Sequence, residues 1–248
     1  ATQNPEVNLN FGYGPANDVK RRFYLISWNC YKFFIDYANL CNWDCKLESG
    51  KLSVLDKWIL ANLTKLVLKV KERLEKYDAA AASQEIEEFV VKDFSTWYIR
   101  RSRERVSLSA EKEDRNTAFS VMYGVLVTLS KLLAPFTPFI AEEIFRNLTG
   151  GESVHLETYP KGDKKLIDRE LEEEMKQARK VVETVHATRK FHNIKLRQPL
   201  NGFSYSIPKR LRKEIESLIA EETNVKNVTF ELTDSKLETP FISLDTNL

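Results

Sequence analysis

The spacing of apolar residues along the first 150 positions predicts a series of helices, each burying at least one side. The first is expected from Asn17 or Asp18 to about Asn39, and it is apolar on most sides, as is typical of a helix surrounded by neighbours. Residues 1–17 are polar and contain two prolines and two glycines, which predicts a loosely structured lead-in.

Ser53, with an acid three residues later at Asp56, gives a capping signal for a second helix that reaches about Tyr77. A third helix is expected from about Ala79 to Val106. Its inward stripe continues at four- and three-residue spacing through Ile86, Val90, Phe94 and Trp97.

Residues 107–114 are polar and predict a break, followed by a fourth helix from about Arg115 to Ala134. Thr137 and Pro138 form a cap and a first helical position for a fifth helix, which stops at Gly150 and Gly151. Four long helices and a shorter one, joined by short loops, predict an antiparallel bundle over residues 18–150.

Beyond Gly151 the pattern changes, and residues 151–248 are expected to form a C-terminal helix plus a small α+β domain. The expected elements are a short extended piece at Val154–Leu156, a helix over about Ile167–Phe191, a strand near Phe203–Ile207, a helix opened by Pro208, and strands near Val225–Leu232 and Pro240–Leu244. The whole chain is therefore predicted to be mainly α.

The chain has 38 basic and 36 acidic residues, so its net charge is too small to attract nucleic acid through the overall electrostatic field. Any such site has to be a local patch. Three cysteines suit a reducing compartment, and Cys41 and Cys45 have no second ligand pair nearby, so zinc is not predicted. No apolar run reaches the ~20 residues of a membrane span, so we expect a cytoplasmic protein with no membrane partner.

The usual catalytic motifs are absent from the sequence. We find no glycine-rich dinucleotide fingerprint, phosphate-binding loop, Gly-x-Ser-x-Gly elbow or His-Glu-x-x-His motif. The paired carboxylates, such as Glu142 and Glu143, are expected on solvated helix exteriors. We therefore predict no catalytic residue, no metal ligand and no cofactor in this chain.

The most promising chemistry lies at the end of the third helix, where two large aromatics meet four arginines: Trp97, Tyr98, Arg100, Arg101, Arg103 and Arg105. Arginine forks and flat rings can hold phosphates and stack on unpaired bases. They can equally be core rings and cations that stabilise a helix C-terminus. From the helical positions we expect Trp97 in the core and Tyr98 to be more exposed.

Several spaced segments carry a family resemblance. Four of them are shared by the valyl, leucyl and isoleucyl enzymes, and two are specifically isoleucyl: Asn29–Leu40, Asp56–Ile59, Phe94–Arg103 and Leu133–Glu143, then Lys195–Leu200 and Asn224–Lys226. On these residues the chain, over about positions 10 to 230, resembles the C-terminal part of a class I aminoacyl-tRNA synthetase, most closely the isoleucyl-tRNA synthetases.

The resemblance implies an anticodon-binding helical bundle followed by a small junction domain, with isoleucine tRNA as the partner. The parent enzyme is expected to ligate isoleucine to that tRNA with ATP and Mg²⁺. The chain lacks the family's two ATP-binding signatures and an editing domain, so it looks like a non-catalytic fragment without a cofactor of its own. The missing catalytic and editing domains are further expected partners, and we expect a monomer.

Given the resemblance, we predict that Arg101, Arg103 and Arg105 contact phosphates of the anticodon stem-loop, and Arg100 is a further candidate for tRNA binding. Trp97 and Tyr98 would be stacking platforms or supports for these arginines. Lys195 and Arg197 form a second candidate set, although Arg197 could instead join the junction domain to the bundle. Two alternatives stay open: a helical protein-interaction module without an RNA role, and the equivalent part of a valyl or leucyl enzyme.

Overall fold

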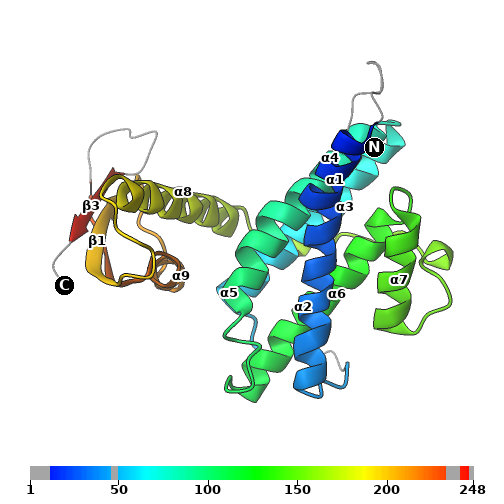
Figure 1. The fold of residues 1–248 in the computed structure, drawn as a ribbon, viewed down its shortest axis with the longest axis horizontal. Helices are drawn as coiled ribbons and strands as arrows, with labels where there is room; N and C mark the ends of the chain where they lie inside the picture. The colour runs from blue at the N-terminus through cyan, green and yellow to red at the C-terminus, as the bar shows by residue number, and fades with distance from the viewer. Residues whose placement is uncertain (1–11, 46–49, 233–240, 246–248) are drawn as a thin grey trace. The chain divides into compact units, whose positions relative to one another are not determined.

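The computed structural model describes residues 12–45, 50–232 and 241–245. It divides into two compact units, the first ending at Ile167 and the second beginning at Asp168 (Figure 1). The finer division into a lead-in, a bundle over 18–150 and a domain over 151–248 stays a prediction.

The first unit opens with one continuous helix that consists of α1 (Tyr13–Val19), a π-helical turn η1 (Lys20–Tyr24) and α2 (Leu25–Leu40). It begins about four residues earlier than predicted, so the expected lead-in is wrong for residues 13–17, while residues 1–11 lie outside the described part. The Ala16 amide donates to the Gly12 carbonyl at 3.0 Å, which closes the first turn. Pro15 is tolerated there because amides of the first turn have no partner within the helix.

Helix α3 (Val54–Glu75) begins with the predicted capping box between Ser53 and Asp56. After it, α4 (Ala79–Glu88), the π-helical η2 (Phe89–Ile99) and α5 (Arg100–Ser102) run on as one helix. This third helix ends four residues before the predicted Val106. Asp78 caps its start by accepting a hydrogen bond from the Ala81 amide at 3.0 Å.

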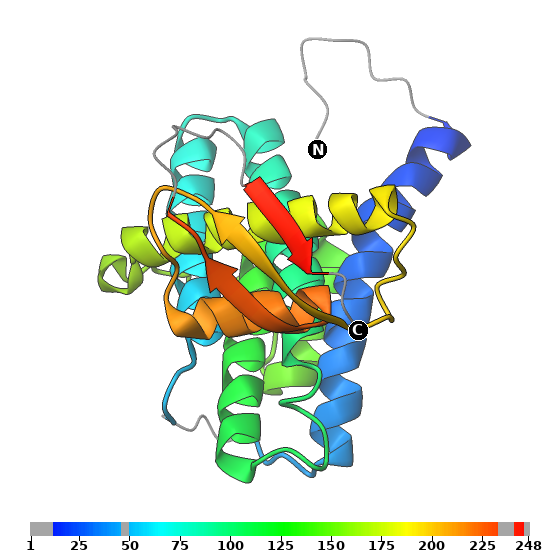
Figure 2. The ribbon, with the colours of Figure 1, turned by 90° about the vertical axis from the view of Figure 1, so that its left-hand side faces the viewer.

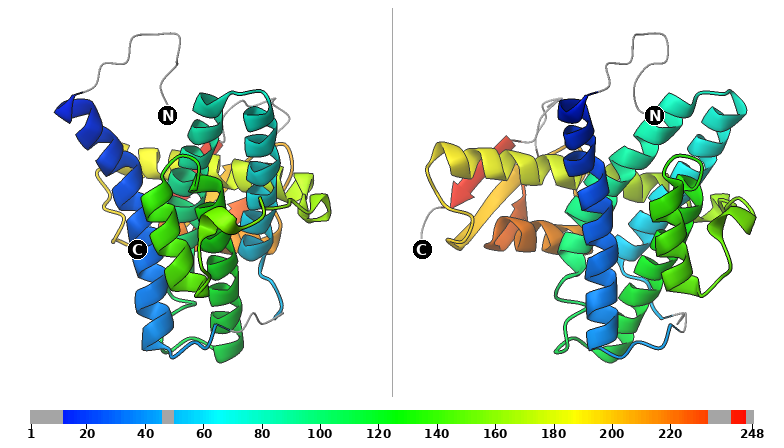
Figure 3. Two further views of the ribbon diagram at one scale, coloured as in Figure 1. Left: turned by 90° about the vertical axis from the view of Figure 1, so that its right-hand side faces the viewer. Right: turned by 45° about the vertical axis from the view of Figure 1, so that its right-hand side comes forward.

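Helices α6 (Lys112–Leu133) and α7 (Pro138–Thr149) pack against each other and complete the bundle, beside which the 13–40 helix runs (Figure 3). Pro138 occupies the first turn of α7, and Gly150 ends that helix with φ of +67°, both as predicted. Within the described residues α6 is long and apolar enough to span a membrane, but 61% of its apolar stretch is buried inside the unit. It is therefore a core helix, and the mainly helical fold is confirmed.

Residues Val154–Leu156 form a 3₁₀ turn, η3, so the predicted extended piece is wrong. The Glu142 carboxylate accepts hydrogen bonds from the Val154 amide at 2.8 Å and from the Ser153 hydroxyl at 3.0 Å. A side chain of α7 thus accepts the backbone hydrogen bond that an extended segment would make with a neighbouring strand. A second such turn, η4, covers Lys164–Leu166.

The described residues of the second unit form two helices and a three-stranded mixed sheet: α8 (Arg169–Phe191), β1 (Leu200–Ser206), α9 (Lys213–Thr223), β2 (Val225–Phe230) and β3 (Phe241–Asp245). The strand order is β2-β1-β3, with β2 parallel and β3 antiparallel to β1. The helices pack together behind the sheet in the view of Figure 2. The small α+β unit is present, as predicted.

The predicted helix start at Pro208 is wrong, because α9 begins five residues later at Lys213. The buried Tyr205 hydroxyl accepts a hydrogen bond from the Leu211 amide at 3.3 Å, which holds the intervening segment in a non-helical path. Strand β3 is described from Phe241, so the expected start at Pro240 lies outside the described residues.

Candidate functional site

Asp56, near the start of α3, is the centre of a buried polar cluster in the first unit. Its side chain is fully buried and accepts hydrogen bonds from the Ser53 amide at 2.9 Å and the Ser53 hydroxyl at 2.6 Å. The Tyr98 hydroxyl, from η2, donates another at 2.6 Å. A buried carboxylate of this kind also needs a cation close by if it is to stay charged.

Arg105 supplies that cation. Its Nη1 and Nη2 groups donate to the two oxygens of Asp56 at 3.0 and 2.8 Å, while Nε and Nη2 reach Asp114 at 2.9 and 2.7 Å. Burial favours a raised pKa for Asp56, but Arg105, Ser53 and Tyr98 outweigh it, so the pKa of this carboxyl is lowered. The fork of Arg105 is occupied by two carboxylates, and the structure places it inside the unit instead of on the expected cationic surface.

Trp97 and Tyr98 are both buried, with 5% and 0% of their surfaces exposed. The prediction that Trp97 belongs to the core is confirmed, and the prediction that Tyr98 is more exposed is wrong. The reason is the π-helical bonding of η2, which joins residues five apart. Phe89 and Phe94, five apart, stack with ring centroids 6.5 Å from each other, and the wider turn directs Tyr98 toward Asp56.

Arg100, Arg101 and Arg103 are the members of the arginine cluster that reach the surface. Arg100 and Arg103 are exposed, and both have helical backbone angles, so their three-residue spacing makes them neighbours on one face. Arg101 is half-buried, with its guanidinium carbon 5.8 Å from the centroid of the Trp97 ring. Trp97 therefore packs against Arg101 and is itself almost fully buried.

In the second unit, Lys195 and Arg197 are exposed in the turn between α8 and β1. The buried guanidinium of Arg189, in the last turns of α8, holds this turn by donating to the carbonyls of Lys195 and Gln198 at 3.1 and 3.0 Å. It also donates to the carbonyls of Thr223 and Asn224 at 2.7 and 3.1 Å. Since the backbone carbonyls face Arg189, the two cationic side chains extend into solvent.

Sequence reasoning missed the supporting residues Asp56, Asp114 and Arg189. The capping pattern predicts a role for Asp56 only at the start of α3, and nothing local indicates that Arg105 binds both Asp56 and Asp114. Arg189 did carry a signal, because it lies four residues after Val185 on the inward stripe of α8. An arginine at a core position predicts a charge held by backbone or by a carboxylate.

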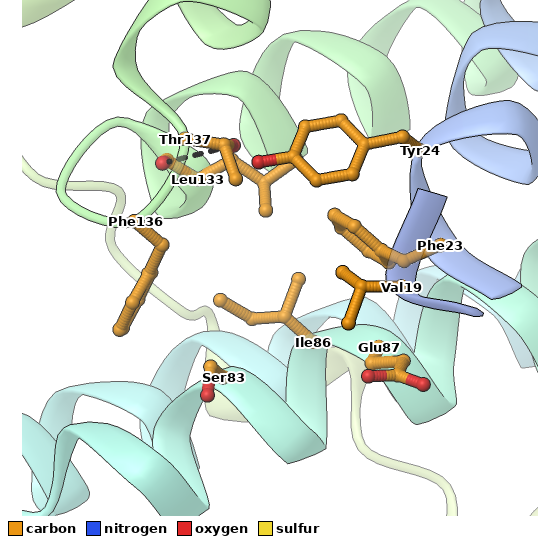
Figure 4. Close-up of a pocket in the computed structure, with 9 residues that line it drawn as sticks. All are labelled: Val19, Phe23, Tyr24, Ser83, Ile86, Glu87, Leu133, Phe136 and Thr137. Atoms are coloured by element: carbon orange, nitrogen blue, oxygen red, sulfur yellow. Dashed lines mark hydrogen bonds between the residues drawn. The ribbon is translucent and has the colours of Figure 1, made fainter. Parts of the chain in front are cut away.

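A cavity of about 120 Å³ lies in the first unit between the 13–40 helix, α4 and the turn from α6 to α7 (Figure 4). Its lining is mostly apolar: Val19, Phe23, Tyr24, Ser83, Ile86, Glu87, Leu133, Phe136 and Thr137. The rings of Phe23 and Tyr24 approach it from one side, and Ile86 from the other. The volume is well below the ~300 to 1,000 Å³ of typical ligand pockets, so we assign it no ligand.

The described residues contain no group of three or more His, Cys, Asp or Glu side chains that could hold a metal ion. Cys30 is buried, and burial raises the pKa of its thiol to about 11, while Cys41 and Cys45 are free thiols. The described residues therefore offer no carboxylate cluster for the Mg²⁺ that the resemblance implies for the parent enzyme.

Comparisons with known proteins give a consistent result. The isoleucine–tRNA ligase of Dehalococcoides mccartyi is 40% identical over 228 residues, that of Thermus thermophilus 37% over 236, and that of Protochlamydia amoebophila 39% over 247. These alignments cover 87–96% of this chain but only 22–23% of the relatives. The chain thus spans about a fifth of the length of the curated relatives it matches.

A family profile described as the anticodon-binding domain of tRNA ligase matches residues 56–203, more than half of the chain. The match begins at Asp56, includes the arginine-bearing helix and ends within β1. The chain therefore belongs to the family of anticodon-binding domains of tRNA ligases.

Proposed function

We propose that this chain binds the anticodon stem-loop of an isoleucine tRNA as the anticodon-binding part of a longer isoleucine–tRNA ligase. The observation that carries the proposal is the family match over residues 56–203, combined with relatives named isoleucine–tRNA ligase along most of the chain. Those names favour isoleucine tRNA over the valine and leucine alternatives. The sequence Lys195–Leu200 supports the same choice.

The arginines at the end of the third helix, from Arg100 to Arg103, form the first RNA contact surface in this proposal. Arg100 and Arg103 pair with phosphates of the anticodon stem-loop, and Arg101, resting against Trp97, supplies a third charge. Arg105 and Tyr98 act indirectly: together with Asp56 they fix the end of the helix that carries the arginines. Bases of the loop are unpaired and can be read on their edges.

Lys195 and Arg197 form a second surface, in the other unit. Their charges are exposed on a turn that Arg189 already holds in place, so binding does not have to order it. We propose phosphate contacts for them as well. We further propose that the chain is divided into a helical bundle (18–150) and a junction domain (151–248).

In this proposal the ligation of isoleucine, with ATP and Mg²⁺, belongs to other domains of a longer cytoplasmic protein that acts as a monomer. The chain covers too little of its relatives to supply that chemistry itself. A protein-interaction module without an RNA role would need a large exposed apolar patch. The family match favours RNA binding over that alternative.

Replacing Arg100 and Arg103 with Ala together tests the first surface. The logarithm of the tRNA binding constant should fall less steeply with the logarithm of salt concentration, by about one unit per lost phosphate contact. Fluorescence anisotropy of a labelled isoleucine tRNA transcript, titrated at several salt concentrations, measures this slope.

The matched control replaces two exposed lysines with Ala, Lys71 near the end of α3 and Lys76 at its C-cap. It removes the same charge and should leave the slope nearly unchanged. Equal slopes for the arginine variant and the unaltered chain would remove Arg100 and Arg103 from the RNA contact surface.

A further inference from the structure

The second unit contains a long stretch without acidic side chains. Between Thr184 and Lys213 there is no Asp or Glu, although the whole chain has 36. The same stretch carries eight cations and two histidines: Arg189, Lys190, Lys195, Arg197, Lys209, Arg210, Arg212 and Lys213, with His186 and His192. Positive charge is thus concentrated in one segment of a chain whose charges nearly cancel overall.

The cations of this stretch differ in their environments. Lys209, Arg210 and Arg212 form ion pairs with glutamates of α8 and α9, Glu170, Glu216 and Glu174. Lys190, Lys195 and Arg197 are exposed and make no ion pair with any residue that the structure describes. Those three charges are available to a partner.

An exposed aromatic pair lies beside these charges. Phe191, the last residue of α8, has 82% of its surface exposed, and the ring of His192 meets it edge-on at 5.1 Å. A single exposed apolar side chain is common and needs no explanation. Here two rings stand together within a run of unpaired cations, and that combination suits a base with its flanking phosphates.

The turn that carries these groups is held firmly by backbone bonds. The Ile194 amide donates to the Arg189 carbonyl at 2.8 Å, and the Asn224 side chain donates to the Leu196 carbonyl at 2.9 Å. Arg189 occupies the carbonyls on either side, at Lys195 and Gln198. A buried arginine bonded to carbonyls instead of carboxylates also keeps its positive charge unneutralised beneath the surface.

We infer that Lys190, Phe191, His192, Lys195 and Arg197, hereafter the α8 tip, form a second RNA site in which an unpaired base stacks on Phe191. The cations of the tip hold the phosphates on either side of that base. The inference rests on the proposed function and extends it, because it adds a base contact to a surface proposed so far only for phosphates. Arg189 is a positioning residue for the site.

Replacing Phe191 with Ala tests the inference without disturbing the fold, because the side chain is already in solvent. The dissociation constant for an isoleucine tRNA transcript should rise by between about 5-fold and about 150-fold, the range of one lost base–ring stack. Phe191→Trp should bind at least as tightly as the unaltered chain. Phe191→Leu should be weakened like the alanine variant, because it keeps the apolar surface and loses the ring.

Phe139→Ala is the matched control, since this residue is 90% exposed at the start of α7 but lies near Glu142 and Glu143. It should bind tRNA normally. For the charges, Lys195→Ala with Arg197→Ala should reduce the salt slope by about two units, whereas Lys164→Ala with Lys165→Ala should not.

The outcomes separate this inference from the proposed function. Normal tRNA binding by Phe191→Ala, or by Phe191→Leu, would overturn the stacking contact and leave the proposed function standing. If Phe191→Ala is weakened but Phe191→Leu is not, the contact of Phe191 with the tRNA is apolar and needs no ring. No binding by the unaltered chain would overturn both.

Discussion

At the scale of single residues, the cluster around Asp56 explains how a helix end rich in arginine is held in place. One buried carboxylate joins the start of α3 to the end of the third helix through Tyr98 and Arg105. Such an ion pair adds little compared with apolar packing, yet removing one partner leaves an uncompensated buried charge. The effect of the cluster on stability is therefore largest when one of its charged residues is removed.

Asp56→Asn should lower the free energy of unfolding of the first unit by about 3 kcal/mol at pH 7. This value is at the low end for a broken buried ion pair, because Asp114 still binds Arg105 in the variant. Urea unfolding followed by tryptophan fluorescence measures this unit alone, since Trp28, Trp43, Trp58 and Trp97 all lie in it. Asp36→Asn, at an exposed pair with Lys32, is the control and should cost less than about 1 kcal/mol.

The same variant has a defined pH dependence. The pKa of Asp56 is lowered in the folded state, so its contribution is complete above the unfolded value of about 3.9 and is lost as the pH falls through the folded value. The difference in stability between the unaltered chain and Asp56→Asn should be constant from pH 5 to 8 and shrink below about pH 4. A difference that stays the same at pH 3 would contradict this assignment.

At the scale of elements, the spacing of apolar residues predicted most helices, because the buried stripe of each helix repeats at helical spacing. The capping residues Ser53 and Gly150 marked the start of α3 and the end of α7. The prediction failed where geometry departs from helical spacing. The π-helical η2 buries Tyr98, which a regular helix would have left on the flank. Pro208 gave a false start signal because the bond from Leu211 to Tyr205 is a tertiary contact.

The sheet of the second unit depends on close approach between β1 and β2. A Cβ atom at Gly202 would lie 2.6 Å from the backbone oxygen of Asn227, so Gly202→Ala has to separate the two strands. We expect a loss of roughly 1–3 kcal/mol in the stability of the second unit. Hydrogen exchange monitored by mass spectrometry should show faster exchange in β1 and β2.

Gly124→Ala is the matched control for this substitution. Gly124 lies in α6, and nothing comes within 4 Å of a Cβ atom placed there, so alanine should be neutral or stabilise that helix by up to about 1 kcal/mol. Unchanged protection of β1 and β2 in Gly202→Ala would show that the strands accommodate the methyl group.

At the scale of the whole molecule, net charge carried little information, because the proposed function depends on where the cationic side chains are exposed. The sequence placed Arg100, Arg103, Lys195 and Arg197 among the candidates, and each is exposed in the structure. It could not show that the fork of Arg105 is occupied, since Asp56 and Arg105 lie 49 positions apart. Long-range pairing of this kind is visible only once the fold is known.

In the proposed function this chain distinguishes isoleucine tRNA by its anticodon region. Fluorescence anisotropy can compare the affinity of the unaltered 248-residue chain for an isoleucine tRNA transcript and for the same transcript carrying the anticodon loop of a valine tRNA. At a fixed salt concentration, binding to the first transcript should be at least about fivefold tighter, the value of one base contact. Equal affinities for the two transcripts would contradict the proposed function.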